Sequence, residues 1–371
     1  MDFSVVHMNS TMIRTSGLTR HFTVRKETVE AVRGLDLHVA SGEMVALLGP
    51  NGAGKSTTLR MLTTLLPPTS GSAEVAGHDV TTGQRGVRSR IGYIGQGNGA
   101  AHSQRGRDEL ISQGRAYGLG ARASRDRAAE LIASLDLEGV ADRTVSSLSG
   151  GQRRRLDIAM GLIHAPDLLF LDEPSTGLDP QNRANLQGHI RALRAEHGTT
   201  IVLTTHYLDE ADQMAERVIV IDHGRVIADD TPARLKADHA GDRVTLTFGG
   251  ERDARRAVTE SLGVVAGARV ERTGARVVIE VAGGVQLAPK LLRGLDDAGI
   301  EVTGVEVTRP TLDDVFLSLT GRSLREDGTA GPGTTQPGTT KAGPTKTGTT
   351  GPSTTNHTAE SGVTTTEGNA A

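Results

Sequence analysis

Four short apolar runs in the first two thirds of the chain have the pattern of strands that are buried on both faces. The runs are residues 44–49 (MVALLG), 167–173 (DLLFLDE), 200–206 (TIVLTTH) and 217–222 (RVIVID). Such runs are typical of a parallel or mixed sheet with helices on both sides. Helices that end at proline or glycine are predicted between them, over residues 55–66, 152–164 and 180–196. The pattern indicates an α/β fold.

The alternation of buried apolar strands with helices ends near residues 237–241. Beyond this point strands and helices are predicted over residues 244–248, 251–263, 269–282 (a hairpin), 285–299 and 301–308. The resulting order, β-α-β-β-α-β, is typical of a small ferredoxin-like domain. A short amphipathic helix over residues 311–321 is expected to close this domain.

The last segment of the chain has a different composition. From Gly328 to Ala371 it is rich in Thr, Gly and Pro and has no aromatic residue. Such a segment cannot bury enough apolar surface to offset its chain entropy, so we expect disorder over residues 325–371. An unselected flexible extension is the simpler interpretation, and a tether or a phosphorylated tail is the alternative.

Composition excludes several classes of protein. The 371 residues include 41 Lys and Arg against 44 Asp and Glu, no Cys, and only 2% aromatic residues. These numbers argue against a general nucleic-acid binder, a disulfide framework, a Cys-ligated metal site and aromatic base-stacking platforms. No apolar run approaches the roughly 18 residues of a membrane span, and the N-terminus lacks the features of a secretion signal. We therefore expect an intracellular globular protein.

A phosphate-binding loop follows the first predicted strand. Gly49-Pro50-Asn51-Gly52-Ala53-Gly54-Lys55-Ser56 has the form GxxxxGKS, stands between a strand and a helix, and is followed by Thr57. The glycines let backbone N–H groups point at phosphate oxygens, and the helix directs the positive end of its dipole to the same place. Lys55 is placed to reach the β- and γ-phosphates, and Ser56 to offer its hydroxyl to Mg²⁺. The alternative is a glycine turn with a chance Lys-Ser.

Two carboxylates end another predicted strand. Asp172 and Glu173 follow the apolar residues 168–171, at the edge of the sheet where α/β proteins bind ligands. Asp172 is placed to hold Mg²⁺, and Glu173 to orient or polarise the attacking water. Alone, such a pair of carboxylates is a helix cap or a solvated turn as often as it is a catalytic pair. Together with the phosphate loop, the pair indicates ATP hydrolysis.

A third motif indicates which phosphate-loop family the chain resembles. Leu148-Ser149-Gly150-Gly151-Gln152 stands some twenty residues before the acidic pair. It resembles the LSGGQ signature of ATP-binding cassette (ABC) ATPases at all five positions, over a region of similarity of about residues 11–236. The resemblance implies a mixed-sheet core with a helical subdomain, ATP and Mg²⁺ as ligands, and an ABC ATP-binding domain over residues 11–237.

The resemblance implies roles for further residues. Gln96 resembles the Q-loop glutamine that touches Mg²⁺ or water, Asp179 ends a segment similar to the D-loop, and His206 resembles the switch histidine. Phe22 stands where the family often has an aromatic residue that stacks on adenine, although a Phe is more often part of a core. In the family two domains meet head to tail, so Ser149–Gln152 are implied to contact the ATP of a second copy. The arginines at 153–155 are interpreted as part of the signature helix.

The C-terminal part narrows the resemblance. Residues 310–321 (PTLDDVFLSLTG), with 149–159 and 205–212, resemble daunorubicin-resistance-type export ATPases, and the similarity covers about residues 11–322. This implies the ATPase subunit of an exporter of a drug, antibiotic or similar compound, peripheral on the cytoplasmic face of the membrane and paired with a type-2 permease. Residues 97–107 depart from the family by being polar and glycine-rich, which bears on permease coupling.

Domain boundaries and a rival function complete the predictions. We expect an N-terminal flank over residues 1–10 and a small α+β domain over residues 241–322, besides the cassette and the tail. The rival to an exporter subunit is a non-transport ABC ATPase that acts as a dimerisation switch on a soluble partner. Both functions use the same site residues, so a neighbouring gene for a permease with about six membrane helices would distinguish them.

Overall fold

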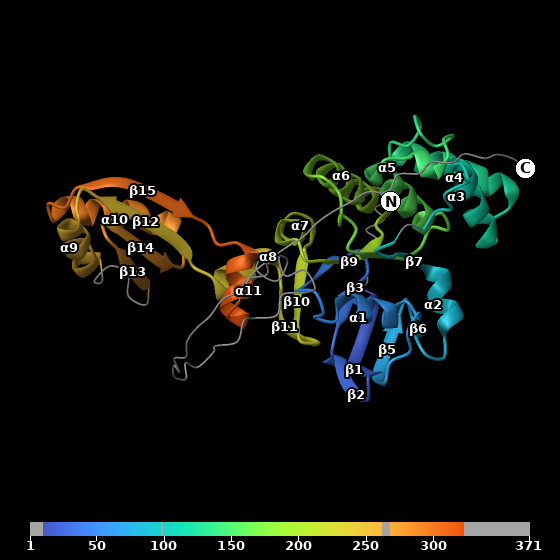
Figure 1. Cartoon of the computed structure of the whole chain (residues 1–371), viewed down its shortest axis with the longest axis horizontal. Coiled ribbons are helices and arrows are strands. Elements are labelled where there is room, and N and C mark those ends of the chain that lie inside the picture. The colour runs from blue at the N-terminus through green and yellow to red at the C-terminus, as the bar shows by residue number, and fades with distance from the viewer. Residues whose placement is uncertain (1–9, 98, 262–267, 323–371) are drawn as a thin grey trace, which may run out of the picture. The chain divides into compact units, whose positions relative to one another are not determined.

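The computed structural model of the chain describes residues 10–97, 99–261 and 268–322 (Figure 1). All of these residues fall within the first of the two units into which the chain divides. The predicted disorder of the tail, residues 325–371, and nearly all of the predicted N-terminal flank lie outside the described residues.

A six-stranded sheet forms the centre of the nucleotide-binding part. Its order is β11-β10-β4-β9-β8-β7, with all neighbours parallel except β10 and β11. The strands are β4 (Met44–Leu48), β7 (Ile91–Ile94), β8 (Leu168–Asp172), β9 (Thr200–Thr205), β10 (Arg217–Asp222) and β11 (Arg225–Asp230). The four strands predicted from apolar runs are confirmed, and every residue of β4, β8 and β9 is buried.

A second sheet, in which all paired strands are antiparallel, packs against one face of the first. It has the order β2-β1-β5-β6, with β3 also paired to β1. Its strands are β1 (Thr11–Val24), β2 (Glu27–Leu35), β3 (His38–Ala40), β5 (Ser70–Val75) and β6 (His78–Asp79). Ile13 and Leu18 of this sheet share a buried cluster with Val45, Leu47 and Phe170 of the central sheet.

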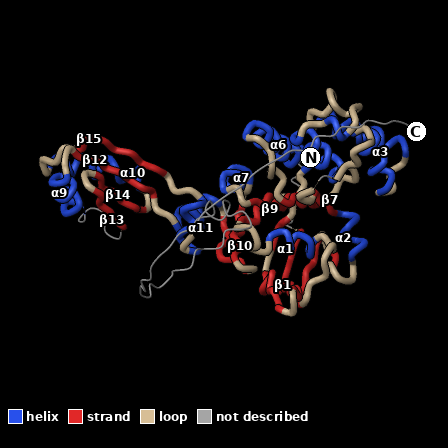
Figure 2. The backbone as a smooth tube through the Cα atoms, viewed as in Figure 1, coloured by secondary structure: helices blue, strands red, loops and turns tan. Residues whose placement is uncertain are grey.

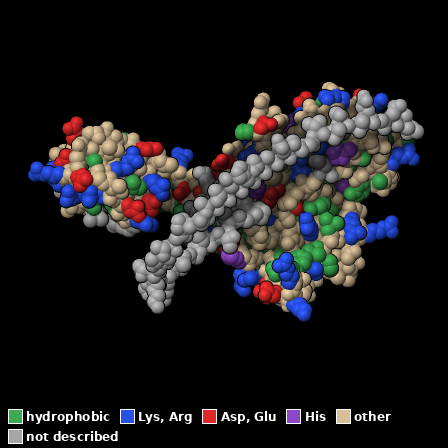
Figure 3. Space-filling model, in the orientation of Figure 1, with side chains coloured by type: hydrophobic (Ala, Val, Ile, Leu, Met, Phe, Trp, Pro, Cys, Tyr) green, Lys and Arg blue, Asp and Glu red, His purple; other side chains and the backbone are tan. Residues whose placement is uncertain are grey.

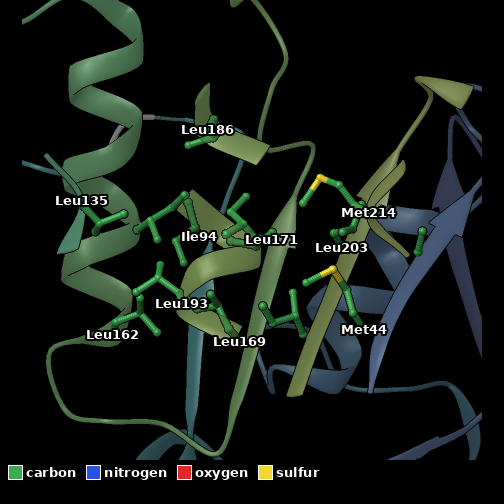
Figure 4. Packing of buried hydrophobic residues seen from close by; sticks show 14 of the residues in the cluster. Met44, Ile94, Leu135, Leu162, Leu169, Leu171, Leu186, Leu193, Leu203 and Met214 are labelled. Carbon is green, nitrogen blue, oxygen red and sulfur yellow. The ribbon is translucent and has the colours of Figure 1, made fainter. Parts of the chain in front are cut away.

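Helices cover the opposite face of the central sheet (Figure 4). Side chains alternate between faces along a strand, so Met44 and Leu48 of β4 lie on this side while Val45 and Leu47 lie on the other. The helices on this face are α3 (Gly106–Ala116), α4 (Ala121–Ser134), α5 (Gly150–Leu162), α6 (Pro180–His197), α7 (Leu208–Met214) and α8 (Pro232–His239). Helices α1 (Lys55–Leu62) and α2 (Gln84–Arg90) instead place their buried side chains in the cluster shared with the second sheet.

The three predicted helices of this part exist with small shifts in their bounds. Helix α1 ends at Leu62, four residues before its predicted end, because Thr64 adopts a left-handed φ of 63°. Helix α5 begins two residues earlier than predicted, because the Ser149 side chain caps it. No helix in the described part of the chain is both long enough and apolar enough to cross a membrane.

The segment beyond α8 forms a separate sheet (Figure 2). Strands β12 (Asp242–Phe248), β13 (Arg269–Thr273), β14 (Arg276–Val281) and β15 (Val302–Thr308) pair antiparallel in the order β13-β14-β12-β15. Helices α9 (Glu251–Ser261) and α10 (Gly284–Asp297) pack on it around their own buried cluster. The predicted order β-α-β-β-α-β is confirmed. On the face of the molecule in Figure 3, basic and acidic side chains are intermixed over this sheet and its helices.

The last helix does not close this second sheet, contrary to the prediction. Helix α11 (Leu312–Thr320) instead packs on α7 and α8. Leu312, Val315 and Phe316 are buried in the cluster that lies on the helical face of the central sheet. The prediction was wrong because amphipathicity shows that a helix has an apolar face and does not show which core receives it.

Candidate functional site

The loop between β4 and α1 lies at the carboxyl end of the central sheet. Gly52 and Gly54 have φ values of 81° and 105°, which L side chains rarely adopt. A Cβ at Gly49 would lie 2.1 Å from the carbonyl oxygen of Ile221, and one at Gly54 would lie 2.5 Å from that of Ala31. The loop therefore needs glycine here both for its turn and for its close approach to neighbouring backbone.

Lys55 is the first residue of α1 and is nearly buried. Its Nζ donates to the carbonyl oxygens of Gly49 at 2.7 Å and Pro50 at 3.0 Å, so the side chain curls back along the loop. Burial lowers the Lys55 pKa, while the nearby Glu173 and Asp172 raise it. The cation and the N-terminus of α1 together make the loop attractive to an anion.

Asp172 ends β8 with its side chain fully buried. Its Oδ1 accepts hydrogen bonds from Ser56 Oγ at 2.8 Å and from Thr204 Oγ1 at 2.7 Å. Gln96, in the segment that follows β7, donates from Nε2 to Ser56 Oγ at 3.3 Å. The structure thus brings together three of the predicted residues, Ser56, Gln96 and Asp172, from three separate segments.

These three residues fit a magnesium ion. A hydroxyl, a carboxylate and an amide are the oxygen-bearing groups that Mg²⁺ accepts, and Mg²⁺ commonly uses one or two carboxylates with water and phosphate as its other ligands. Within the described ranges no group of three or more His, Asp or Glu side chains could hold a metal by itself. A single carboxylate beside a hydroxyl matches a site that the phosphates of a nucleotide would complete.

Glu173 adopts a left-handed backbone conformation with φ of 49°. One carboxylate oxygen lies 3.9 Å from Lys55 Nζ; the other lies 3.4 Å from His206 Nδ1 and accepts from Thr176 Oγ1 at 3.1 Å. His206 is the main cause that lowers the Glu173 pKa, helped by Lys55 and Thr176, although burial acts in the opposite direction. The lowered pKa keeps the Glu173 carboxylate ionised near neutral pH, which is the form that a general base must have.

The segment after Glu173 connects to α6 and α7. Asp179 caps α6 and accepts from the backbone and side-chain nitrogens of Asn182 at 3.0 and 2.5 Å. Ser175 Oγ donates to Glu210 Oε1 at 2.9 Å, which joins this segment to α7. The predicted residue Asp179 therefore acts as the N-cap of α6. It ends the segment that Ser175 joins to α7.

The signature residues form a helix N-terminus. Ser149 Oγ accepts from the Gln152 backbone N–H at 3.3 Å, and Gln152 Oε1 accepts from the Ser149 backbone N–H at 2.9 Å. This capping box leaves the Ser149 hydroxyl hydrogen available for another acceptor. Within the described ranges, no hydrogen bond or ion pair joins residues 149–152 to the loop at 49–57 of the same chain.

Phe22 lies on β1, opposite Val29 of β2, and is partly exposed rather than part of the core. The Arg20 guanidinium stands 4.8 Å from the centre of its ring. The structure therefore presents Phe22 as an accessible aromatic side chain, apart from the cluster around Asp172.

Sequence reasoning missed several residues that shape the site. The Thr204 hydroxyl donates to the Asp172 carboxylate and accepts from the Glu173 backbone N–H. The Thr176 hydroxyl donates to the Glu173 carboxylate. Arg154 donates to the backbone carbonyls of Asp172 and Pro174, the residues on either side of Glu173. Thr204 carried one usable signal: it is a hydroxyl within a strand predicted to be apolar and buried. Arg154 was hidden within a run of three arginines.

Comparisons with known proteins match two parts of the chain to family models. Residues 32–176 match the family model described as ABC transporter, and residues 231–320 match that of the C-terminal domain of the DrrA1-3-like ATP-binding proteins. The chain is 45% identical over 320 residues to daunorubicin resistance ATP-binding protein DrrA3 of Streptomyces coeruleorubidus, covering 86% of this chain and 98% of the relative. It is 38% identical over 299 residues to Nod factor export ATP-binding protein I of Paraburkholderia xenovorans, covering 80% and 93% of the two chains.

Solved structures resemble the nucleotide-binding part. A dimeric bacterial ABC transporter cassette superposes with a TM-score of 0.55 at 26% identity, covering 59% of this chain and 98% of that one. The cassette cbiO1 of Clostridium perfringens, part of an ABC transporter complex, gives a TM-score of 0.56 at 27% identity, with coverages of 62% and 91%. The chain belongs to the ABC transporter ATP-binding proteins of the daunorubicin resistance type, and it is the ATP-hydrolysing subunit of an exporter.

Proposed function

We propose that the chain powers the efflux of a drug, antibiotic or similar amphipathic compound through a separate type-2 permease, from the cytoplasmic face of the membrane. The names of relatives support the cargo class, since they include daunorubicin resistance and Nod factor export proteins. The observation that carries the proposal is the convergence of Lys55, Ser56, Asp172, Glu173 and His206 at one edge of the sheet.

The domain assignment is part of the proposal. Residues 11–237 form the cassette together with α11, which packs on α7 and α8. The small α+β domain begins at residue 241 and ends before α11. The chain therefore leaves the cassette after α8 and returns to it at residue 312.

In this proposal the phosphates of ATP lie on the loop at 49–57, with Lys55 against the β- and γ-phosphates and the adenine on Phe22. Ser56, Asp172 and Gln96 hold Mg²⁺, which when bound neutralises charge on the phosphates. Glu173 accepts the proton of the attacking water. His206 approaches the γ-phosphate and keeps the glutamate ionised.

A second copy of the chain completes each site. Ser149 can donate its hydroxyl hydrogen to a γ-phosphate because its oxygen is already engaged as the cap of α5. Gly151 offers a backbone N–H at the same helix N-terminus, which attracts an anion. A side chain at Gly151 would come within 2.6 Å of Asn182 Oδ1, next to the Asp179 cap.

The test of the site is Glu173→Gln in the full-length chain. Because the amide cannot accept the proton, turnover should fall at least about 100-fold, while ATP still binds and a closed dimer accumulates on size-exclusion chromatography. The exposed Glu138→Gln serves as the control and should keep its turnover. Near-normal turnover of Glu173→Gln would contradict the assignment.

The test of the export role uses membranes. The chain should co-purify with an integral membrane permease, and daunorubicin or another cargo candidate should stimulate the ATPase activity of that complex. Failure to recruit any membrane partner would favour the rival function, a dimerisation switch that acts on a soluble partner.

A further inference from the structure

Arg154 is the fifth residue of α5, and its side chain is almost fully buried beside the candidate site. Its guanidinium donates to three backbone carbonyl oxygens: Pro174 at 2.8 Å, Gly95 at 2.7 Å and Asp172 at 3.2 Å. Only 8% of the residue is exposed. One side chain thus connects the signature helix to two different segments of the candidate site.

Two of these carbonyls flank Glu173. The residue has a φ of 49°, a left-handed conformation that residues other than glycine seldom adopt. The Asp172 carbonyl belongs to the peptide group that precedes Glu173, and the Pro174 carbonyl lies one peptide group beyond the one that follows it. Arg154 therefore holds the backbone on both sides of this residue. A planar guanidinium matches such a pair of acceptors, whereas an ammonium group is a point donor.

The third carbonyl precedes Gln96. One turn further along α5, Asp157 accepts from the backbone N–H groups of Gly99 at 3.0 Å and Ala100 at 3.2 Å. Helix α5 therefore binds the backbone on both sides of Gln96, through Arg154 before it and through Asp157 after it. Asp157 is only 4% exposed, so these bonds are shielded from water.

We propose that Arg154 is a positioning residue through which the signature helix holds Glu173 and Gln96 in their reactive places. The inference rests on the roles proposed for those two residues. Ser149 stands at the N-terminus of the same rigid helix and acts on the ATP of the second copy. Through α5 and Arg154, binding of Ser149 to that ATP therefore affects the position of Glu173 and Gln96, which act on the chain's own ATP.

The test compares Arg154→Lys with Arg155→Lys in the full-length chain. Arg155 is the matched control because it follows directly on α5 and also donates to a carbonyl, that of Leu135, away from the site. Arg154→Lys should lower kcat about tenfold or more while the KM for ATP stays within about threefold, because orientation for hydrolysis is lost and phosphate binding is kept. Arg155→Lys should change neither value by more than about twofold.

A double substitution separates positioning from a merely structural role. If Arg154 acts through Glu173, Arg154→Lys should lose most of its effect on single-turnover hydrolysis when Glu173 is already Gln. An equal effect in both backgrounds, or a parallel loss of kcat and ATP affinity, would overturn the proposal. Arg154→Gln is the second variant should the lysine variant not fold. A Glu173→Gln chain that turns over normally would instead refute the proposed site itself, so the two failures are distinguishable.

Discussion

Helix α11 places Phe316 in the core of the cassette, so truncation of this side chain should destabilise the cassette itself. Phe316 is fully buried, in the cluster that also holds Leu235 of α8 and Met214 of α7. Replacing a buried phenylalanine by alanine typically costs about 3–5 kcal/mol in free energy of unfolding, from lost transfer energy and the cavity left behind. Leu317, the next residue, is 47% exposed, and its alanine variant should cost at most about 0.5 kcal/mol.

The tyrosines of the chain can report on the unfolding of the cassette. It has no Trp and only three Tyr, at positions 93, 117 and 207, and all three lie in the cassette. Tyrosine fluorescence during urea unfolding therefore reports on the cassette and is silent on β12–β15. For a slope near 3 kcal/mol per M, the Phe316→Ala midpoint should fall by about 1–2 M urea.

The control decides the interpretation. If Phe316→Ala and Leu317→Ala shift the tyrosine transition equally little, helix α11 does not belong to the cassette core. If α11 instead closed the small domain, Phe316→Ala would leave the tyrosine signal unchanged and would lower a transition seen only by circular dichroism.

Three further predictions concern the site and its supports. Gly49→Ala should weaken binding of a fluorescent ATP analogue at least about tenfold, since its Cβ would lie 2.1 Å from the Ile221 carbonyl oxygen; unchanged affinity would contradict the need for close approach. Thr204→Val should cost about 1–3 kcal/mol in urea unfolding, because the buried Asp172 carboxylate loses a donor; a variant as stable as the parent would refute this. Burial raises the Glu210 pKa above its value in the unfolded chain. At a pH between these two pKa values the folded chain keeps a proton that the unfolded chain has released. The free energy of unfolding therefore falls as pH rises from the unfolded pKa through the folded one. Glu210→Gln should flatten that fall in melting temperature above about pH 4.3, and an unchanged pH slope would count against it.

The elements that the sequence predicted well are those with a strong local signal. The strand before Gly49 and the strand before Asp172 are uninterrupted apolar runs, and helix α6 carries Asp179 as its cap, Pro180 as its first residue and Gly198 after its end. Local composition and capping chemistry suffice in such places.

The sheet of order β2-β1-β5-β6 was not predicted, because the hydrophobic pattern of its strands is weak. Strand β1 is long and polar, and many of its residues are partly or fully exposed. The hydrophobic alternation that would mark it is broken by two shifts of register against β2. A strand of this kind is stabilised by its partners more than by its own pattern.

The supporting residues of the site depend on packing between distant segments. Arg153, Arg154 and Arg155 are adjacent in sequence, but each points about 100° further around the helix than the one before. Their carbonyl partners consequently differ: Arg153 bonds Val145, Arg154 bonds the backbone around Glu173, and Arg155 bonds Leu135. A sequence shows three equal cations, and only the fold distinguishes the one that faces the site.

The return of the chain at α11 has a consequence for genetic truncation and for proteolysis. A stop codon anywhere in the small domain deletes residues 312–320 and leaves Leu235 and Met214 without the side chains that cover them. A protease cut in the same domain removes nothing, since α11 stays bound to α7 and α8 by its own buried face. Premature termination and nicking at one position should therefore have opposite outcomes, an unstable cassette in the first case and an intact two-fragment cassette in the second.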